Sequence, residues 1–325
     1  MPAEIDVSIV LVSWNTRKLL LECLAALPNA LGPLEAEVWV VDNASSDDSV
    51  GAVRTWAATA SLPVHLIENS ENVGFAAANN QAIARSTGRY VLLLNTDTLP
   101  EPNAIANLVA FADSQPLCGM VGGMLLNPDG SFQGSFAAFP NFVSEVLNAS
   151  GLGRRLFGAW YPNAGPREAQ VARKVDYIQG ACMLARREAI DEVGMLDEGY
   201  FMYNEEPDWC WRMRQAGWET WYTPDARILH YGGQSTRQVR HAMIQALYRS
   251  KVRYIRKHHG TWNARLLQAA FVVLLRLKWL VLLVQALRTS QPILPPIRWN
   301  DLNSATTATI SLGSSIKHRE AKERP

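Results

Sequence analysis

The sequence predicts an α/β fold: a mostly parallel central sheet flanked by helices, followed by a C-terminal helical appendage. Two observations support this prediction. Strands alternate with helices of about ten to fifteen residues through the first half of the chain, the pattern of βαβ units. The apolar run Val91–Leu94 is bounded by turn formers, which is typical of a strand buried on both faces.

The residues that follow this central run suggest a ligand site. Ligands of open α/β sheets collect beyond the carboxyl ends of the strands. The run ends in Asn95-Thr96-Asp97-Thr98, so Asp97 lies where a metal ion or a diphosphate would be held. The alternative is that Asp97 only caps the following turn or helix.

The remaining elements follow in chain order. Further strands are expected at Val7–Trp14, Glu37–Val41, Pro63–Ile67, Gly119–Leu126, Val175–Arg186, Trp218–Thr223 and Ala226–Tyr231. Helices are expected at Arg17–Leu27, Phe75–Ser86, Asn103–Ser114 and from about Pro207 to Gly217. The first four strands end in polar loops rich in Asn, Asp and Ser, and together these loops predict a ligand-binding rim. Asn127–Gly165 is rich in Gly, Pro and aromatic residues and is expected to be a mobile lid over the site.

The composition changes after Gln238. Val239–His258 predicts a basic helix, and Arg265–Leu287 is nearly all apolar and long enough to span a bilayer. Arg276 and Lys278 near its middle each cost about 2.5–3.5 kcal/mol on the insertion scale, so this helix is expected to lie on a membrane surface. Electrostatic support is expected from the basic residues Arg249, Lys251, Arg253, Arg256 and Lys257. The alternative is a helical pair packed on the main domain or on a second subunit.

Length, charge and cysteine content narrow the class of protein. The chain has 325 residues, 48% of them hydrophobic, and a formal net charge of +1. This length allows one large domain with an appendage, and the near-zero charge argues against nucleic-acid binding. We divide the chain into residues 1–236 as the main domain, 237–290 as the helical region and 291–325 as a flexible tail. The acidic N-terminus is unlike a signal peptide. The cysteines form no CxxC pair and suggest reduced core thiols of a cytoplasmic protein: Cys23, Cys118, Cys182 and Cys210.

Several stretches together resemble the inverting family 2 glycosyltransferases with the GT-A fold, especially the bacterial rhamnosyltransferase-like branch. These are Ser8–Thr16, Val41–Ser49, Glu71–Ala84, Leu94–Thr98, Gln179–Leu184, Met202–Gly217 and His230–Ser235. They cover roughly residues 6–236, occur in the order of the family, and lie at predicted strand ends. The sequence contains no GxGxxG fingerprint or P-loop, so a dinucleotide enzyme or an NTPase has little support.

The resemblance implies a divalent cation, Mg²⁺ or Mn²⁺, because sugar transfer builds negative charge on the departing diphosphate. Asp97 matches the last acid of the Asp-x-Asp motif of the family, and His230 matches a histidine that completes the metal site. Asn95 replaces the first acid of that motif and is expected to contact the donor. The alternative for His230 is a structural role after a strand.

The resemblance also implies a donor site. Asp42 matches the acid that contacts the nucleobase or ribose, although Asp42 and Ser45 could instead cap a helix after Asn43. Asn72 is expected to bind polar donor groups, and Gly74 to let the backbone approach the ligand. Three further donor-site residues are implied: Ser13, Asn15 and Asn79.

An inverting transfer needs a base that takes the proton of the acceptor hydroxyl. The family carries this base in a Glu-Asp pair at a helix start, here Glu205-Glu206, so Glu206 is the expected base. The helix dipole and a nearby cation would lower its pKa, whereas desolvation would raise it, and the sequence leaves this balance open. Glu205, Asp208 and Gly180 are expected to orient the base or bind the acceptor.

We therefore expect a metal-dependent, inverting glycosyltransferase at the cytoplasmic face of a bacterial membrane. Its acceptor would be a cell-envelope polysaccharide or a lipid-linked glycan, and a homo-oligomer is compatible with these features. The resemblance points to dTDP-L-rhamnose as the donor, with UDP-hexoses left open. The alternative is a non-catalytic scaffold or partner subunit with the same fold, which only the departures Asn95 and Glu206 support. A nucleotidyltransferase is a poor match because the SWNTRK loop lacks a basic phosphate-binding signature.

Overall fold

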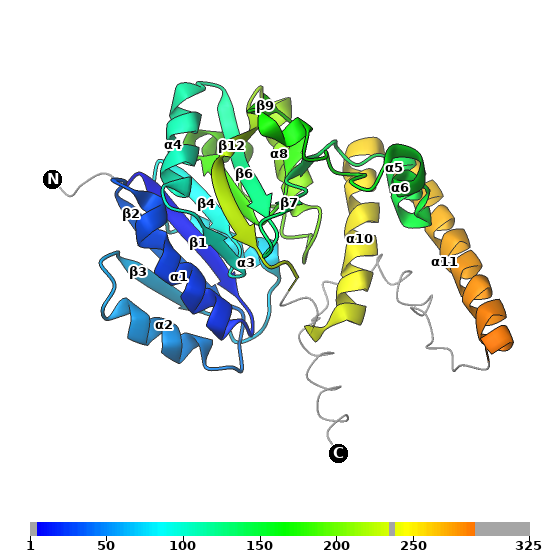
Figure 1. The fold of residues 1–325 in the computed structure, drawn as a ribbon, viewed down its shortest axis with the longest axis horizontal. Coiled ribbons are helices and arrows are strands. Elements are labelled where there is room, and N and C mark those ends of the chain that lie inside the picture. The colour runs from blue at the N-terminus through cyan, green and yellow to red at the C-terminus, as the bar shows by residue number, and fades with distance from the viewer. Residues whose placement is uncertain (1–4, 234–237, 290–325) are drawn as a thin grey trace, which may run out of the picture.

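The computed structural model describes residues 5–233 and 238–289, which form an α/β domain and two long C-terminal helices (Figure 1). The strands are β1 (Val7–Ser13), β2 (Ala36–Asp42), β3 (Val64–Glu68), β4 (Tyr90–Leu94), β5 (Thr98–Pro100), β6 (Cys118–Leu126), β7 (Phe132–Gln133), β8 (Phe136–Ala137), β9 (Arg173–Lys174), β10 (Tyr177–Ile178), β11 (Cys182–Arg186) and β12 (Glu219–His230). The helices are α1 (Arg17–Leu31), α2 (Ser49–Ala57), α3 (Phe75–Ile83), α4 (Ala104–Ser114), α5 (Phe142–Ser150), α6 (Leu152–Phe157), α7 (Arg187–Val193), α8 (Glu205–Gln215), α10 (Arg240–His259) and α11 (Thr261–Thr289), with a 3₁₀ turn at Glu168–Gln170.

The main sheet has ten strands in the order β3-β2-β1-β4-β11-β6-β12-β5, with β7 on β6 and β9 on β12. β3, β2, β1 and β4 are parallel. β11 is inserted antiparallel between β4 and β6, and β12 runs parallel to β6. The expected α/β fold with a mostly parallel sheet and a helical appendage is therefore confirmed, as a mixed sheet with a parallel half.

Helices cover both faces of this sheet, and alternation along the strands explains how (Figure 1). Leu92 of β4 packs in one core with α1 and α4, whereas Val91 and Leu93 pack in a second core with α3, α7 and α8. Successive strand residues point to opposite faces, so an unbroken apolar run supplies both cores. The four cysteines are buried free thiols, as expected.

Two strand predictions differ from the structure. The segment expected as one strand from Val175 to Arg186 is split, because the chain leaves the small β10–β8 sheet and enters the main sheet at Gln179–Ala181. Conversely, the two short strands expected near Trp218 and Ala226 are a single strand, β12, with an irregularity between Tyr222 and Arg227. Pro224 lies within this irregularity, where a missing N–H is tolerated.

The segment Asn127–Gly165, expected to be a mobile lid, has more regular structure than its composition predicts. This segment contains β7, β8, α5 and α6, and α5 packs against α11 beside the main domain (Figure 1). A reciprocal capping box between Asn141 and Ser144 begins α5, and Gly151 ends it with φ +78. Within this segment, the cavity described below is lined by Gln133 and Gly134.

Helix α10 follows the alternative for the appendage, because it packs on the main domain. Tyr254 and Ile255 of α10 share a buried cluster with Tyr200 and with Phe271 of α11. Ser250 Oγ also donates a hydrogen bond to the Met202 carbonyl at 2.8 Å. In the ranges 5–233 and 238–289, no helix combines the length and apolar character needed to cross a membrane. The predicted tail at 291–325 and Ser235 of the last motif lie outside the described residues.

The basic cluster expected to attract a membrane is mostly turned toward the protein. Lys251 pairs with Glu145 of α5. Arg253 and Lys257 pair with Asp197 at 2.9 and 2.7 Å. These three cations are therefore neutralised by acids of the main domain and of α5, and the expected electrostatic role for them is wrong.

Candidate active site

A cavity of about 320 Å³ lies at the carboxyl ends of β1, β2 and β4. Asp97, His230 and Glu206 all line it, although they are distant in sequence. Asn95, Asn72, Gly74, Gly180 and Glu205 line it as well. The polar loops after the parallel strands thus form a rim at one edge of the sheet.

Asp97 directly precedes β5, and His230 ends the neighbouring strand β12. Thr98 pairs with His230 in the antiparallel register, and the Tyr231 amide donates to the Asp97 carbonyl at 3.0 Å. As a result, His230 Nε2 lies 3.4 Å from Asp97 Oδ1. Both side chains are largely shielded from solvent: 15% of the His230 side-chain surface and 9% of the Asp97 side-chain surface are exposed.

Gln133 orients the histidine. Gln133 Oε1 lies 2.6 Å from His230 Nδ1, and Gln133 Nε2 donates to Asn127 Oδ1 and to the His230 carbonyl. Because Oε1 can only accept, Nδ1 carries the proton and Nε2 keeps its lone pair. Metal-binding histidines are typically held by such a bond from the other ring nitrogen.

The Asp97–His230 pair fits a divalent cation held partly by substrate. His230 Nε2 is buried and makes no hydrogen bond to any described residue. Across the described part of the chain, no group of three or more His, Cys, Asp or Glu could hold a metal. One carboxylate, one imidazole and the cavity-lining Asn95 leave coordination positions for diphosphate and water oxygens, the usual arrangement for Mg²⁺.

Glu205 and Glu206 begin helix α8, and the preceding turn aims them into the cavity. Tyr203 and Asn204 have φ values of +70 and +65, two consecutive left-handed residues that reverse the chain immediately before the helix. Oε2 of each glutamate is buried without a hydrogen-bond partner among the described residues. Among the described residues, no Lys, Arg or His side chain pairs with either carboxylate, and the cations beside α8 pair with Asp208 instead.

Desolvation dominates the pKa values of this pair. Burial raises the pKa of Glu206 to about 7. Burial, together with the charge of the neighbouring Glu206, raises the pKa of Glu205 well above its usual range. The balance that the sequence left open therefore favours the protonated forms, because the helix N-terminus supplies too little stabilisation to offset lost hydration.

Two glycines shape the surroundings of α8. A Cβ on Gly180 would lie 3.8 Å from the Glu206 carboxyl carbon, so this glycine lies beside the carboxylate. Gly74 has φ +91, and a Cβ there would lie 2.6 Å from the Phe201 carbonyl oxygen. The Phe75 amide donates to that carbonyl at 2.7 Å. Gly74 is thus required for packing of the turn before α8, and because it also lines the cavity, its expected approach to a ligand stays a prediction.

Asn43 joins the cavity wall and was missed by the sequence analysis. It donates to Asn72 Oδ1 at 3.2 Å and to the Gly74 carbonyl at 3.3 Å, and it accepts from Asn69 Nδ2 at 2.9 Å. This network ties the loop after β2 to the loop after β3. Asn43 directly follows Asp42 in the strand-end motif, and the sequence analysis assigned the donor contact to Asp42 alone.

Asp42 lies at the end of β2, opposite Ser13 of β1, and does not line the cavity. Its Oδ2 accepts from the Ser45 amide at 2.8 Å, whereas its Oδ1 is buried with no hydrogen-bond partner in the described structure. Helix α2 begins only at Ser49, with Asp48 as its N-cap. The alternative of a helix cap by Asp42 and Ser45 is therefore wrong, and the contact of Asp42 with the donor stays a prediction.

Other expected donor residues also lie outside the cavity wall. Ser13 Oγ lies 3.4 Å from Thr16 Oγ1. Asn15 accepts from the Ser46 amide at 2.7 Å, and Asn79 donates to the Phe75 carbonyl at 2.8 Å. The structure uses these side chains to hold loops and a helix turn in place.

Asp208 faces the opposite way from Glu206 and contacts α10. It is fully buried, 2.7 Å from both Lys257 Nζ and His258 Nε2 and 3.0 Å from Arg212 Nε. Hydrogen bonds from His258 and Lys257 outweigh its burial and lower the pKa of Asp208 to about 2. The structure does not bring Asp208 to the cavity, so the expected contact with the acceptor is corrected.

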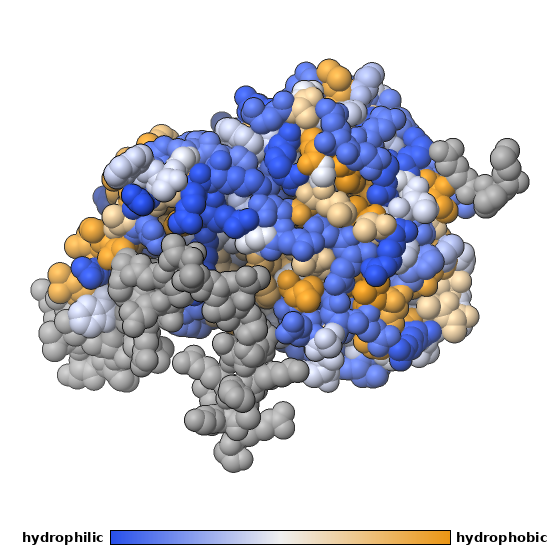
Figure 2. Space-filling model, turned by 180° about the vertical axis from the view of Figure 1, so that it is seen from behind, coloured by the Kyte–Doolittle hydropathy of each residue, from blue (hydrophilic) through white to orange (hydrophobic). Residues whose placement is uncertain are grey.

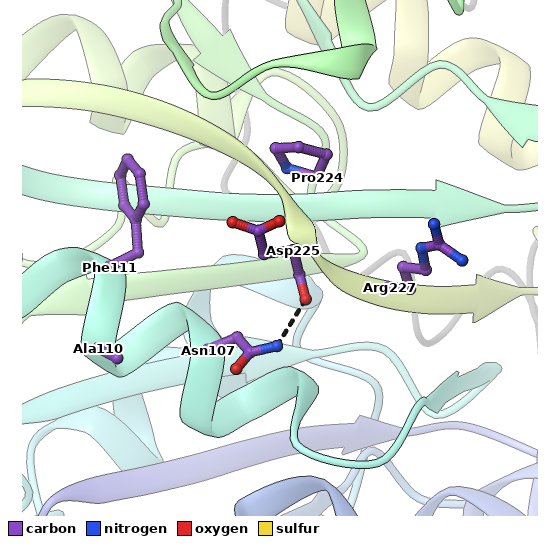
Figure 3. Close-up of a pocket in the computed structure, with 6 residues that line it drawn as sticks. All are labelled: Asn107, Ala110, Phe111, Pro224, Asp225 and Arg227. Carbon is purple, nitrogen blue, oxygen red and sulfur yellow. Dashed lines mark hydrogen bonds between the residues drawn. The ribbon is translucent and has the colours of Figure 1, made fainter.

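A second hollow lies between α4 and β12, remote from all expected site residues (Figure 3). Asn107 donates to the Asp225 carbonyl at 2.7 Å across it, and Phe111 and Arg227 line its ends. These groups stabilise the contact of α4 with β12, and they form no cluster of acidic and imidazole side chains.

A family model for glycosyl transferase family 2 matches residues 8–194. The chain belongs to this family. The match spans more than half of the chain, and it includes Asp97 but ends before the Glu205-Glu206 pair and His230. The chain is accordingly a glycosyltransferase of family 2.

Relatives with assigned names agree with this membership. N-acetylglucosaminyl-diphospho-decaprenol L-rhamnosyltransferase of Mycobacterium tuberculosis is 29% identical over 249 residues, which cover 70% of this chain and 78% of that protein. The low-salt glycan biosynthesis hexosyltransferase of Haloferax volcanii is 27% identical over 214 residues, which cover 65% of this chain and 62% of that protein.

Solved structures share the fold. GalNAc-T7 with UDP, GalNAc and Mn²⁺ has a TM-score of 0.58 at 15% identity, covering 79% of this chain and 48% of that one. The mannosyltransferase PcManGT of Pyrobaculum calidifontis, in complex with GDP-Man and Mn²⁺, has a TM-score of 0.55 at 18% identity, covering 99% of this chain and 89% of that one. The fold is therefore GT-A-like.

Proposed function

We propose that this glycosyltransferase is metal-dependent and inverting, and that it transfers a sugar from a nucleoside diphosphate to an acceptor hydroxyl. One observation carries the proposal: the Asp97–His230 pair and the Glu205–Glu206 pair line the same cavity. The first pair suits a cation and its diphosphate, and the second suits a proton acceptor. An inverting transfer needs these two functions on either side of the anomeric carbon.

In this mechanism Asp97 and His230 would hold the cation, and the hydrogen bond between Gln133 and His230 Nδ1 leaves Nε2 as the ligand atom. The cation, Mg²⁺ or Mn²⁺, would neutralise charge that develops on the diphosphate oxygens. Asn95 and Asn72, which also line the cavity, supply polar contacts to the donor. Asp42 Oδ1 is the acceptor for a donor hydroxyl or base N–H beyond the cavity wall.

Glu206 acts as the base. Its carboxylate takes the proton of the acceptor hydroxyl while the acceptor oxygen bonds to the anomeric carbon. The bond from that carbon to the diphosphate oxygen breaks, and the electron pair leaves with the diphosphate. A pKa near 7 suits this role, since a general base works best when its pKa lies near the operating pH. Glu205, whose pKa burial and the neighbouring Glu206 raise well above its usual range, lies beside the base at the start of α8.

We further propose L-rhamnose, carried by dTDP, as the donor sugar and a lipid-linked or cell-envelope glycan as the acceptor. The relative from Mycobacterium tuberculosis supports this choice, because its name states an L-rhamnosyl transfer to a decaprenol-linked sugar. Such an acceptor would place the enzyme at the cytoplasmic face of a membrane. The scaffold alternative is weakened, because Glu206, one of its two supports, lines the cavity with a raised pKa.

The test measures nucleoside diphosphate release from dTDP-L-rhamnose and UDP-hexoses with Mg²⁺, Mn²⁺ or a chelator. Asp97→Asn should lower turnover by about 100-fold or more, since a cation contributes several kcal/mol to charge stabilisation. Asp225→Asn, in the hollow of Figure 3, is the matched control and should retain activity. Turnover in the chelator would refute metal dependence. A product that retains the anomeric configuration would refute inversion, and turnover with UDP-hexoses alone would refute the rhamnose donor.

A further inference from the structure

Exposed apolar side chains gather on the appendage. Among the described residues, fifteen large hydrophobic side chains are exposed. Five of them lie between residues 143 and 160, and seven lie on α11 between 262 and 281. Leu156 and Phe157 of α6 are 64% and 65% exposed, and Val281 of α11 is 56% exposed. Scattered single residues of this kind are ordinary on a protein surface, but a concentration of eleven on α5, α6 and α11 indicates an interaction surface.

These helices are joined into one body. α5 packs on α11, and Lys278 Nζ of α11 donates to the Ala149 carbonyl of α5 at 2.7 Å. α6 follows α5 after a single residue, Gly151. Figure 1 shows α5, α6 and α11 together on the far side of α10 from the sheet, and Figure 2 shows apolar residues at the edge where α11 lies. We call the exposed side chains of α6 and α11 the apolar platform.

Charge identifies the occupant of the apolar platform. The sequences of α6 and α11 contain six Arg or Lys residues and no Asp or Glu. Arg154 and Arg155 are exposed beside Leu156, and Arg276 and Lys278 are exposed on α11. A second copy of the chain would bring like charges together, whereas anionic lipid headgroups complement them. Trp262 and Trp279, 76% and 41% exposed, suit the boundary between headgroups and acyl chains.

We propose that the apolar platform docks on an anionic lipid bilayer. Its apolar side chains enter the boundary between headgroups and acyl chains, and its exposed arginines contact lipid phosphates. This differs from the expectation built on the basic residues of α10, three of which, Lys251, Arg253 and Lys257, pair with acids of the protein. The proposal goes beyond the transferase chemistry and does not depend on it.

The position of α10 gives this docking a consequence. Met243 of α10 lines the cavity, and the same helix packs on α11 through Tyr248 and Phe271. α10 therefore connects the cavity wall to the apolar platform. If the proposed function holds, this connection sets the height of the cavity above the lipid surface.

The experiment sediments the full chain with vesicles of phosphatidylcholine alone or with added phosphatidylglycerol, without any nucleotide sugar. Wild type should bind the anionic vesicles roughly tenfold more tightly than the neutral ones at low salt, and lose this preference at high salt. Leu156→Asp should weaken binding by roughly tenfold or more, because it places a charge in the boundary region. Leu117→Asp, at a residue 56% exposed outside the appendage, is the matched control and should bind as wild type does.

Three results would overturn the proposal: no binding to either vesicle at low salt, binding by Leu156→Asp equal to that of wild type, or loss of binding in both variants. Sedimentation velocity without lipid tests whether a second copy of the chain covers the apolar platform. A dimer that Leu156→Asp dissociates would also overturn the lipid proposal. Circular dichroism confirms that each variant is folded. Because no sugar donor is present, failure here is distinguishable from failure of the proposed transferase function.

Discussion

Helix α8 places carboxylates in two contrasting environments within a single turn. Its cavity side carries Glu206, whose pKa is raised to about 7. Its α10 side carries Asp208, whose pKa is lowered to about 2. Burial opposes ionisation of both groups, so burial alone does not explain the difference.

The difference lies in the partners. Asp208 contacts Lys257, His258 and Arg212, and their hydrogen bonds and charges exceed the cost of burial. Glu206 has one buried oxygen without a hydrogen-bond partner in the described structure. A buried carboxylate with cationic partners joins elements of the fold, whereas Glu206, without them, has a pKa near 7 and can accept a proton near neutral pH. Asp208 therefore has a structural role between α8 and α10, whereas Glu206 is the candidate base.

The largest expected effect is the loss of kcat when Glu206, on the cavity side of α8, is replaced by a neutral residue. Glu206→Gln should lower kcat by roughly 10²- to 10⁴-fold, the usual contribution of a general base. The unfolding free energy should stay equal or rise, because the amide removes a poorly solvated charge. Rates of nucleoside diphosphate release and a denaturant titration measure these two quantities. Glu188→Gln, at an exposed position of α7, is the control. Retention of more than about a tenth of the activity would assign the base elsewhere.

Replacing Asp208, on the α10 side of α8, by a neutral residue should lower the unfolding free energy more than it lowers kcat. Asp208→Asn removes the buried carboxylate that Arg212, Lys257 and His258 contact, and Lys257 keeps only Asp197, so the change should cost about 3–5 kcal/mol of unfolding free energy. Asp191→Asn, at an exposed position of α7, should change it by less than about 0.5 kcal/mol. In the folded fraction, kcat should fall far less than in Glu206→Gln. A comparable loss of kcat in both variants would contradict the division between the two sides of α8.

The sequence predicted most of the sheet because local patterns determine it. β1, β2 and β4 are apolar runs that end in polar loops, and each appears within a few residues of its expected range. The helices within Asn127–Gly165 were not predicted, because composition outweighed the capping signals Asn141 and Gly151, which mark the ends of α5. The break between β10 and β11 depends on pairing with β8, and such long-range pairing leaves no local pattern.

The site was predictable where a residue directly follows a strand or begins a helix. Asp97, Glu206 and His230 satisfy this condition, and they line one cavity. Gln133 does not, because its role depends on a contact with His230 across 97 positions of sequence. The direction of Asp208 depends on contacts with Lys257 and His258 of α10, which lie 49 and 50 positions away in the sequence. Long-range contacts of this kind could not be inferred from periodicity or spacing.

The smallest expected effect is a difference in pH dependence: Glu206 should determine how activity changes with pH, and Asp208 how stability changes with pH. Glu206 acts when deprotonated, and its pKa is raised to about 7, so kcat/KM should fall roughly tenfold per pH unit below 7 and level off above it. Asp208 has its pKa lowered from 3.8 to about 2. Its stabilising contribution is complete above pH 4 and is lost only as the pH falls through about 2.

Between about pH 7 and about pH 5, activity should therefore disappear while the contribution of Asp208 to the fold persists. Initial rates and denaturant titrations in the same buffers test this separation. An apparent kinetic pKa near the ordinary value for glutamate, 4.5, would show that the cavity is hydrated during catalysis, and the desolvation argument for Glu206 would fail. Parallel loss of rate and stability would instead mean that both sides of α8 titrate as one unit.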